Sequence, residues 1–381
     1  MWRRIEVAAA PWGTGRAGGS GATSPFAAHL ARSAARPATH RLVQAAVPDG
    51  LVPAGAGLGP RGDARATDSR GAAAMLRTLM PLTADTRRRV LRLILFALAV
   101  VGALVGMAVF LRQVAADPLA DARAYYDAGA RLNAGLPLYP AGADPNAPEF
   151  YRYPPLLAMA FRPLALLPFP AAAAIWEAVV VASFLATLWL LGVRRRATWL
   201  AVGLLGIPIG FTLAVAQAHA LVTLLLTIGS PFGIALAANI KLFPLLAGAW
   251  LMGRRDWRRV RALAAWTAGL VGVQFVLEPQ ATIDFLGTLT LGQVGDVRNY
   301  SPYAMSPVLW AMLLVAGVLL ALRLAPTRWG WAAAVSLATL APPRLSIYMF
   351  MGLLAALRPD RFTAASVPPP NSGDMSTPAQ S

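Results

Sequence analysis

The chain has 381 residues, of which 57% are hydrophobic and only 13% are charged, and its formal net charge is +17. A soluble globular domain carries about 25% charged residues, so the composition excludes that class and indicates a polytopic membrane protein. Cysteine is absent, which excludes disulfides, thiolate metal sites and a cysteine nucleophile. The arginines cluster in a leading tail and in short loops between apolar runs. This placement follows the positive-inside rule, so we expect a lipid bilayer and no nucleic acid as partner.

The two ends of the chain differ in composition from the middle. Residues 1–74 are rich in Gly, Ala, Arg and Pro and show no sustained helical or strand period. Such a segment buries too little apolar surface to order itself. We therefore predict a disordered tail over 1–74, a membrane domain over 75–358 and a disordered cytoplasmic tail over 359–381. Two other interpretations of the first segment stay open, namely translation that starts at Met75 or Met80 and an organellar transit peptide.

Apolar runs predict the membrane spans in chain order. The first span covers about 90–111 and follows three arginines, so it exits outward into a polar extracytoplasmic loop over 112–153. Later spans are expected at 261–277, 307–324, 329–341 and 345–357.

Two stretches do not fit straight spans. Residues 154–169 and 217–253 contain only short, proline-interrupted apolar pieces, whereas a straight span needs about 20 residues. Broken or re-entrant helices would resolve this, and such backbone is tolerated only where protein buries it or it lines a wet cavity. The predicted fold is an all-α polytopic membrane protein with about 8–10 transmembrane or re-entrant helices and a helical first extracytoplasmic loop.

Lys241, in "AANIKLFPLL", is the only lysine of the chain and lies in one of these stretches. A charge at bilayer depth costs about 2.5–3.5 kcal/mol on insertion scales and usually faces a cavity and a partner. One interpretation is a lysine that snorkels to the interface. The other is a compact cation facing an anion such as a phosphate, with Pro244 breaking the helix nearby and freeing backbone N–H groups.

The extracytoplasmic loop contains "DPLADARAYYDAGARLNAGLPLYP" at 117–140. Asp121, Tyr125 and Ala128 share one helical face, and Gly135 and Pro137 end the helix. Asp121 is a candidate general base, while a helix N-terminal charge or cap is the alternative interpretation.

Other polar residues also have two interpretations. Asp127 is expected to be solvated or paired with Arg131 at i+4. Arg152, in "FYRYPPLLA", is either part of an interfacial aromatic belt or a clamp for a lipid phosphate. Gln217 and His219 lie in the apolar "AVAQAHALVTLLL" and are either satisfied polar groups of a helix bundle or site residues. No metal- or nucleotide-binding motif is present.

Together these stretches resemble glycosyltransferase family 87, the polyprenol-phosphate-mannose-dependent α-mannosyltransferases of the bacterial cell envelope, which have a GT-C-type membrane fold. The resemblance runs from about residue 90 to 357 and is carried by the Asp121 helix leading into "GLPLYP", by "FYRYPPLLA" with "PLALLP", by "AQAHALVTLLL", and by "IKLFPLL" followed by "RRDW". Ala216 and His219 stand where the family usually has Gly and Asn.

The resemblance implies a reaction and a site. Mannose would pass from a polyprenyl-phosphate-mannose donor to a lipid or glycan acceptor of the cell envelope, with inversion. Asp121 would remove the acceptor proton as general base. Lys241, Arg152 and His219 would bind the donor phosphate. The remaining substrate-binding residues expected are Tyr125, Tyr126, Tyr153, Gln217 and Asp127. A donor with one phosphate needs no metal, so we expect no cofactor. The enzyme would lie in the cell inner (plasma) membrane with its active site on the extracytoplasmic side.

Two competing functions stay open. A membrane transporter or lipid flippase also fits broken helices and a buried cation, although the two halves show no convincing self-similarity. An inactive GT-C-like scaffold is the third reading, because the chain departs from the family pattern near His219. A transferase predicts that Asp121, Arg152 and Lys241 converge on one cavity, whereas a transporter predicts a central pore without that convergence.

Overall fold

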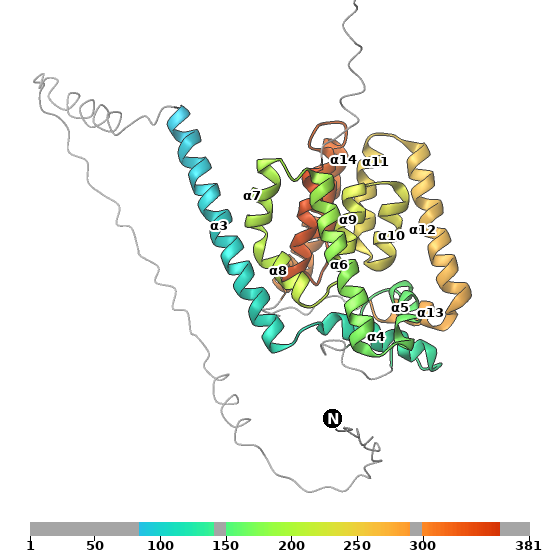
Figure 1. Cartoon of the computed structure of the whole chain (residues 1–381). Coiled ribbons are helices and arrows are strands. Elements are labelled where there is room, and N and C mark those ends of the chain that lie inside the picture. Colours follow the sequence, from blue (N-terminus) through green and yellow to red (C-terminus); the bar gives the residue numbers. More distant parts are fainter. Residues whose placement is uncertain (1–83, 141–149, 290–298, 359–381) are drawn as a thin grey trace, which may run out of the picture. The chain divides into compact units, whose positions relative to one another are not determined.

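The computed structural model describes residues 84–140, 150–289 and 299–358, and every regular element in these ranges is a helix (Figure 1). In chain order the elements are α3 (Ala84–Ala116), α4 (Ala120–Asn133), α5 (Pro155–Phe161), η1 (Leu164–Leu166), α6 (Phe169–Leu191), α7 (Arg196–Leu204), α8 (Gly206–Ala214), α9 (His219–Ile228), α10 (Pro231–Ile240), η2 (Phe243–Gly248), α11 (Ala249–Gly253), α12 (Trp257–Leu277), α13 (Pro279–Gly287), η3 (Pro302–Ala304), α14 (Pro307–Leu324), α15 (Gly330–Leu340) and η4 (Ile347–Leu357). The tails predicted over 1–74 and 359–381 lie outside the described residues.

Four of these helices, α3, α6, α12 and α14, are long and apolar enough to cross a membrane. The pair α7 and α8, bent by 70°, is a fifth candidate. The other apolar helices have only 10–17 residues: α9, α10, η2 with α11, α15 and η4. The chain is therefore an all-α polytopic membrane protein, as predicted. The broken helices expected in 154–169 and 217–253 are confirmed, because α5 and η1 occupy the first stretch and α9, α10, η2 and α11 the second.

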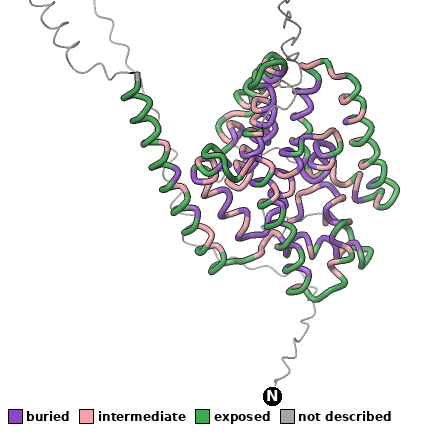
Figure 2. The backbone as a smooth tube through the Cα atoms, turned by 45° about the horizontal axis from the view of Figure 1, so that its top comes forward, coloured by how far each residue is buried: buried purple, intermediate pink, exposed green. Residues whose placement is uncertain are grey.

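The long helices face outward and the short ones lie inside. Only 11% of the apolar window of α3, 11% of that of α12 and 6% of that of α14 is buried. Figure 2 shows the buried residues concentrated in the inner helices, while α3 is exposed along most of its length. A helix too short to span leaves unsatisfied backbone groups at both ends, and these are costly in contact with lipid. Enclosure by the longer helices removes that cost.

Glycines allow α3 to pack closely on α7 and α8 (Figure 1). Gly102 and Gly106 of α3 meet the backbone of Gly203 and Gly206, where a methyl group would collide with backbone atoms. Gly210 extends the same contact along α8. Lipid tails are as apolar as leucine, so helices associate in membranes through close packing of small residues rather than through burial from water.

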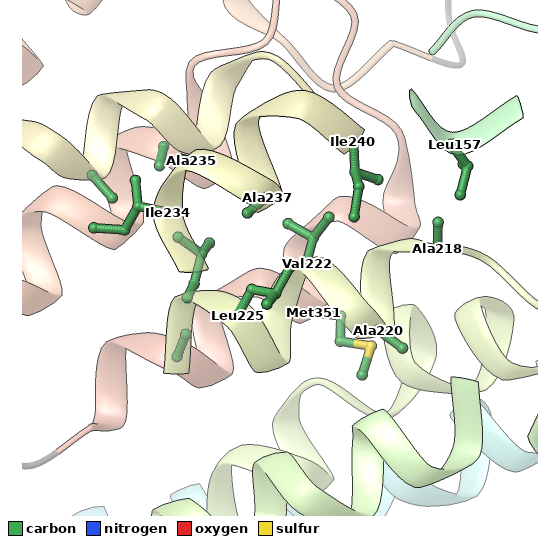
Figure 3. Packing of buried hydrophobic residues seen from close by; sticks show 14 of the residues in the cluster. Leu157, Ala218, Ala220, Val222, Leu225, Ile234, Ala235, Ala237, Ile240 and Met351 are labelled. Atoms are coloured by element: carbon green, nitrogen blue, oxygen red, sulfur yellow. The ribbon is translucent and has the colours of Figure 1, made fainter. Parts of the chain in front are cut away.

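The α9–α10 hairpin forms the centre of the core. Gly229 ends α9 in a left-handed conformation at φ +58°, and Pro231 begins α10. The Ser230 hydroxyl accepts a hydrogen bond from the Gly233 amide at 3.0 Å and caps the new helix. Figure 3 shows apolar side chains of both helices, such as Val222 and Ile240, gathered in one cluster with Met351 of η4.

A buried glutamine of α12 connects three of the inner elements through hydrogen bonds. Gln274 of α12 donates to the Asn239 side chain at 2.7 Å and accepts from the Leu156 amide at 3.1 Å. The second bond satisfies a free amide at the N-terminus of α5, where no helical carbonyl is available. One buried carboxamide thereby joins α12, α10 and α5, and it holds the segment that follows Tyr153 in place.

Candidate functional site

The site begins at the N-terminus of α4. Two backbone hydrogen bonds attach this end to the end of α8, from the Leu119 amide to the Ala214 carbonyl at 3.1 Å and from the Asp121 amide to the Val215 carbonyl at 3.2 Å. At its other end α4 stops before Gly135, which has φ +66°, as the sequence predicted. The first turn of α4 is thus fixed against the turn between α8 and α9.

Asp121 is held by a hydrogen bond from a distant residue. The Gln217 Nε2 atom donates to the Asp121 Oδ2 atom at 2.9 Å, across 96 positions of sequence. No side chain caps α4 at its N-cap position, whereas Asp121 is the acidic residue of the first turn, as the interpretation of a helix N-terminal charge requires. Burial raises the pKa of Asp121 to about 6, against the opposing effect of the positive charges of Lys241 and Arg152. A carboxylate with such a pKa is suited to proton transfer near neutral pH.

Gln217 joins three predicted site residues. Besides Asp121, it accepts a hydrogen bond from the Tyr125 hydroxyl at 2.6 Å and donates to the Tyr153 hydroxyl at 3.1 Å. The Tyr125 ring is completely buried and lies edge-on to the Tyr153 ring, with 5.3 Å between centroids. Gln217 and Tyr125 fix each other and orient the carboxylate, since neither side chain is exposed to solvent.

The turn that carries Gln217 contains a non-glycine residue with an unusual backbone conformation. Ala216 adopts a left-handed conformation with φ +54°, and its carbonyl accepts a hydrogen bond from Trp176 Nε1 at 2.8 Å. A non-glycine residue pays about 1–2 kcal/mol for this conformation. The position is the one where we noted alanine in place of a usual glycine. The turn therefore keeps its glycine-type shape in this chain despite the side chain.

Lys241 lies at the end of α10 and is 9% exposed. Its Nζ atom is buried and has no hydrogen-bond partner among the described residues. The ammonium instead lies over two aromatic rings, 5.0 Å from the centroid of Tyr153 and 4.3 Å from that of Tyr348. This placement contradicts the snorkelling interpretation, because a snorkelling lysine carries its charge to water. A buried cation without hydrogen-bond acceptors is a candidate binding position for an anion.

Arg152 brings a second cation to this cluster. It is half-buried between Tyr151 and Tyr153, and its charge acts on Asp121. Burial, together with the positive charge of Arg344, lowers the pKa of Arg152. Asp121, Arg152 and Lys241 thus lie close enough for their charges to interact, while the common cavity that a transferase predicts stays a prediction.

Three predicted residues lie differently. Tyr126 donates to the Leu167 carbonyl at 2.8 Å and packs on Phe169, so it attaches α4 to the segment before α6. Asp127 is exposed on the opposite face of α4. Its expected partner Arg131 donates through Nε to the Pro137 carbonyl at 2.8 Å instead.

His219 is the third such residue. Its Nε2 atom hydrogen-bonds the Met349 carbonyl at 2.8 Å, so its ring holds η4. A bond to a phosphate through the same nitrogen would have to replace this contact. The phosphate-binding role of His219 stays a prediction.

The sequence analysis missed two residues of the cluster, Arg344 and Tyr348, in "PPRLSIY". Both lie at or near the start of a segment that we expected to be a plain apolar span over 345–357. Like the stretch around Arg152, this one combines a double proline with an arginine and a tyrosine, in the opposite order, and this composition was the available signal.

The described residues contain no group of three or more His, Cys, Asp or Glu side chains that could hold a metal ion. A separate apolar groove of about 460 Å³ lies between α14, α15 and η4. Its lining includes Trp310, Leu337, Leu345 and Phe350 but not Asp121, Arg152 or Lys241. The groove is therefore a neighbour of the cation cluster and not part of it.

A carboxylate of raised pKa near a buried ammonium in a helical membrane protein is an arrangement typical of the active sites of membrane enzymes. The family model of glycosyltransferase family 87 matches residues 150–366, more than half of the 381-residue chain. The chain belongs to this family and is a membrane glycosyltransferase. Arg152, Gln217 and Lys241 lie within the matched residues, and Asp121 precedes them.

One relative is the polyprenol-phosphate-mannose-dependent alpha-(1-2)-phosphatidylinositol pentamannoside mannosyltransferase of Mycolicibacterium smegmatis. It is 31% identical over 182 residues, which cover 42% of this chain and 44% of the relative. The match thus spans less than half of the relative's length. No solved structure matches this chain.

Proposed function

We propose that the protein transfers mannose from a polyprenyl-phosphate-mannose donor to a hydroxyl group of a cell-envelope lipid or glycan. The observation that carries this proposal is the buried, unpartnered Lys241 Nζ atom in the same cluster as Asp121. The mannosyltransferase relative supports the choice of donor, because its name specifies a polyprenol-phosphate-mannose dependence.

Each charged group has one task in the proposed reaction. Asp121 accepts the proton of the acceptor hydroxyl while the acceptor oxygen forms a bond to C1 of the mannosyl group. The bond from C1 to the phosphate oxygen breaks, and its electron pair leaves with the polyprenyl phosphate. The phosphate gains one negative charge in this step, and Lys241 and Arg152 stabilise that charge. Attack from the face opposite the leaving group inverts a β-linked donor to an α-mannoside.

Gln217 and the tyrosines prepare these groups. Gln217 keeps the Asp121 carboxylate oriented, while Tyr125 and Tyr153 hold Gln217. The Tyr153 ring also faces the Lys241 ammonium. The proposed base and anion site are therefore connected through Gln217 and Tyr153, which limits their separation before substrate binds. We expect the reaction on the extracytoplasmic side of the plasma membrane, where α4 follows the first outward span.

The test is transfer of radiolabelled mannose from polyprenyl-phosphate mannose in membranes that contain the full chain. We expect Asp121→Asn to lower transfer by about 10²–10⁴-fold, the usual contribution of a general base. Lys241→Met is expected to weaken transfer while the protein still accumulates, and Tyr126→Phe, outside the cluster, serves as the control variant. A wild-type protein that transfers nothing to a broad set of envelope acceptors would refute the proposal. Translocation of the donor lipid would then be measured next.

A further inference from the structure

The segment that leads from α15 into the first turn of η4 places Tyr348 against the Lys241 ammonium, and its residues were not predicted from the sequence. We propose that the segment Pro343–Met349 supplies the second half of the anion site, in which Arg344 binds the phosphate of the lipid donor and Tyr348 positions the Lys241 ammonium. The identity of the ligand rests on the proposed function. The placement of the two side chains rests on the contacts of the segment itself.

Asn299 fixes the backbone on both sides of Arg344. Its side-chain Nδ2 donates to the Pro343 carbonyl at 2.8 Å, and its Oδ1 accepts from the Leu345 amide at 2.8 Å. The Tyr300 amide adds a third bond, to the Leu345 carbonyl at 2.9 Å. Asn299 is itself buried. Three hydrogen bonds to the residues on either side of Arg344 hold its Cα in a set position, and recognition of a small anion requires such positioning.

His219 fixes the other end of the segment through its hydrogen bond to the Met349 carbonyl. Tyr348, which precedes this carbonyl, is thereby held with its ring 4.3 Å from the Lys241 Nζ atom. The Tyr153 ring faces the same ammonium at 5.0 Å. The ammonium thus lies against two aromatic rings, and its N–H groups stay available for a phosphate oxygen.

Arg344 extends the site toward Arg152. The charge of Arg344 acts on Arg152, and that of Arg152 acts on Asp121, so the three groups lie in one electrostatic neighbourhood. Two positive charges that act on each other favour the binding of an anion. Guanidinium groups also bind phosphate oxygens in pairs. Arg344 and Arg152 therefore fit a phosphate that Lys241 approaches from α10.

The other side of the segment indicates that the phosphate belongs to a lipid. Leu345 and Phe350, on either side of Tyr348 in sequence, line the apolar groove between α14 and α15. This part of the chain thus contributes Arg344 and Tyr348 to the polar cluster. It contributes Leu345 and the adjacent Phe350 to the groove. A ligand with an anionic head and a long hydrocarbon matches this division better than a free phosphate does.

The first experiment measures binding of undecaprenyl phosphate to the purified full chain in nanodiscs, with undecaprenol as the uncharged probe. We expect Arg344→Gln to weaken binding of the phosphate about tenfold to a hundredfold, as for loss of a charge-assisted contact, and to leave undecaprenol binding unchanged. Arg344→Lys keeps the charge and is expected to retain most of the affinity. Arg323→Gln, on an exposed arginine of α14, is the matched control. Equal binding by the Arg344→Gln and Arg323→Gln proteins would overturn the role of Arg344.

The second experiment tests Tyr348 in the same assay. Tyr348→Phe keeps the ring over the ammonium and is expected to bind within about threefold of wild type, whereas Tyr348→Leu loses the ring and is expected to bind about threefold to tenfold more weakly. Trp266→Leu removes an aromatic ring of α12 that packs on Phe232 outside the cluster, and it controls for general loss of packing. If Tyr348→Phe and Tyr348→Leu weaken binding equally, the ring does not position Lys241 and this part of the inference is wrong.

Binding and transfer separate this inference from the proposed function. A chain that binds undecaprenyl phosphate through Arg344 but transfers no mannose supports the inference and refutes the function. If Arg344→Gln leaves mannose transfer unchanged, the proposed function stands and the inference about Arg344 is wrong. Inorganic phosphate that competes as well as undecaprenyl phosphate would show that the site recognises the anion alone and would overturn the assignment to a lipid.

Discussion

Replacement of Gln217 by methionine tests whether the carboxylate of Asp121 is tuned by its single side-chain hydrogen bond. Methionine keeps the length of the side chain and removes the Nε2 donor, which lies 2.9 Å from Asp121 Oδ2. That donor stabilises the ionised form of the carboxylate, so its loss raises the pKa of Asp121 further. The base is then protonated over a wider pH range and transfer falls on the acid side.

The size of the effect follows from the structure. A hydrogen bond to a charged group contributes about 1.5–3 kcal/mol, and one pKa unit corresponds to about 1.4 kcal/mol. Because burial raises the pKa of Asp121 to about 6 in the wild type, we expect it near 7 in Gln217→Met after partial compensation by water. At pH 6 the ionised fraction then drops about fivefold, and at pH 8 it hardly changes.

Two readouts measure this shift. The first is the pH dependence of kcat/KM for mannose transfer, whose acid limb is expected to fall below pH 6 in the wild type and to move up by about one unit in Gln217→Met. The second is infrared titration of the carboxyl band that disappears in Asp121→Asn, which needs no activity. Gln274→Met is the matched control, because Gln274 is also a buried bridging glutamine, with Asn239 and Leu156 as partners. An acid limb that stays in place in Gln217→Met, or one that moves equally in Gln274→Met, would refute the reasoning.

The remaining predictions concern stability and the anchors of the site. The folded pKa of Asp121 lies above its ordinary value of 3.8, so its contribution to stability is lost as pH rises from about 4 to 6, and Asp121→Asn should raise the Tm relative to wild type at pH 8 more than at pH 4; a Tm difference independent of pH would contradict this. Ala216→Gly should stabilise the protein by about 1 kcal/mol in chemical denaturation, by relief of the left-handed backbone, and an unchanged or lower stability would argue against strain there. Gly106→Val should lower the Tm strongly because it separates α3 from α8, while Gly272→Ala, with open space around it, should not; equal Tm values would exclude close packing at Gly106. His219→Gln should keep transfer within about tenfold, since an amide also donates to the η4 carbonyl, whereas a loss as large as that of Lys241→Met would favour a direct phosphate contact.

The family and the membrane class could be predicted from composition and from short sequence motifs. Composition alone excluded a soluble domain, and short motifs around Asp121, Arg152 and Lys241 carried the resemblance to family 87. The end of a helix could also be predicted from nearby residues. Gly135 stops α4 because glycine adopts the left-handed backbone there without strain. Prolines and short apolar runs predicted the broken helices, because hydrocarbon thickness sets a minimum length for a straight span.

Which residues of the site contact one another was decided by the tertiary structure. Asp121 and Gln217 meet only because the N-terminus of α4 attaches to the end of α8, and no spacing rule joins positions 96 residues apart. The Tyr348 ring reaches Lys241 because His219 holds the start of η4, a contact that a pattern of apolar residues over 345–357 does not contain. Periodicity reports which face of a helix is apolar and not which helix it meets. The sequence by itself therefore determined the class of protein and its charged residues, while the packing of short enclosed helices decided which of those charges lie together.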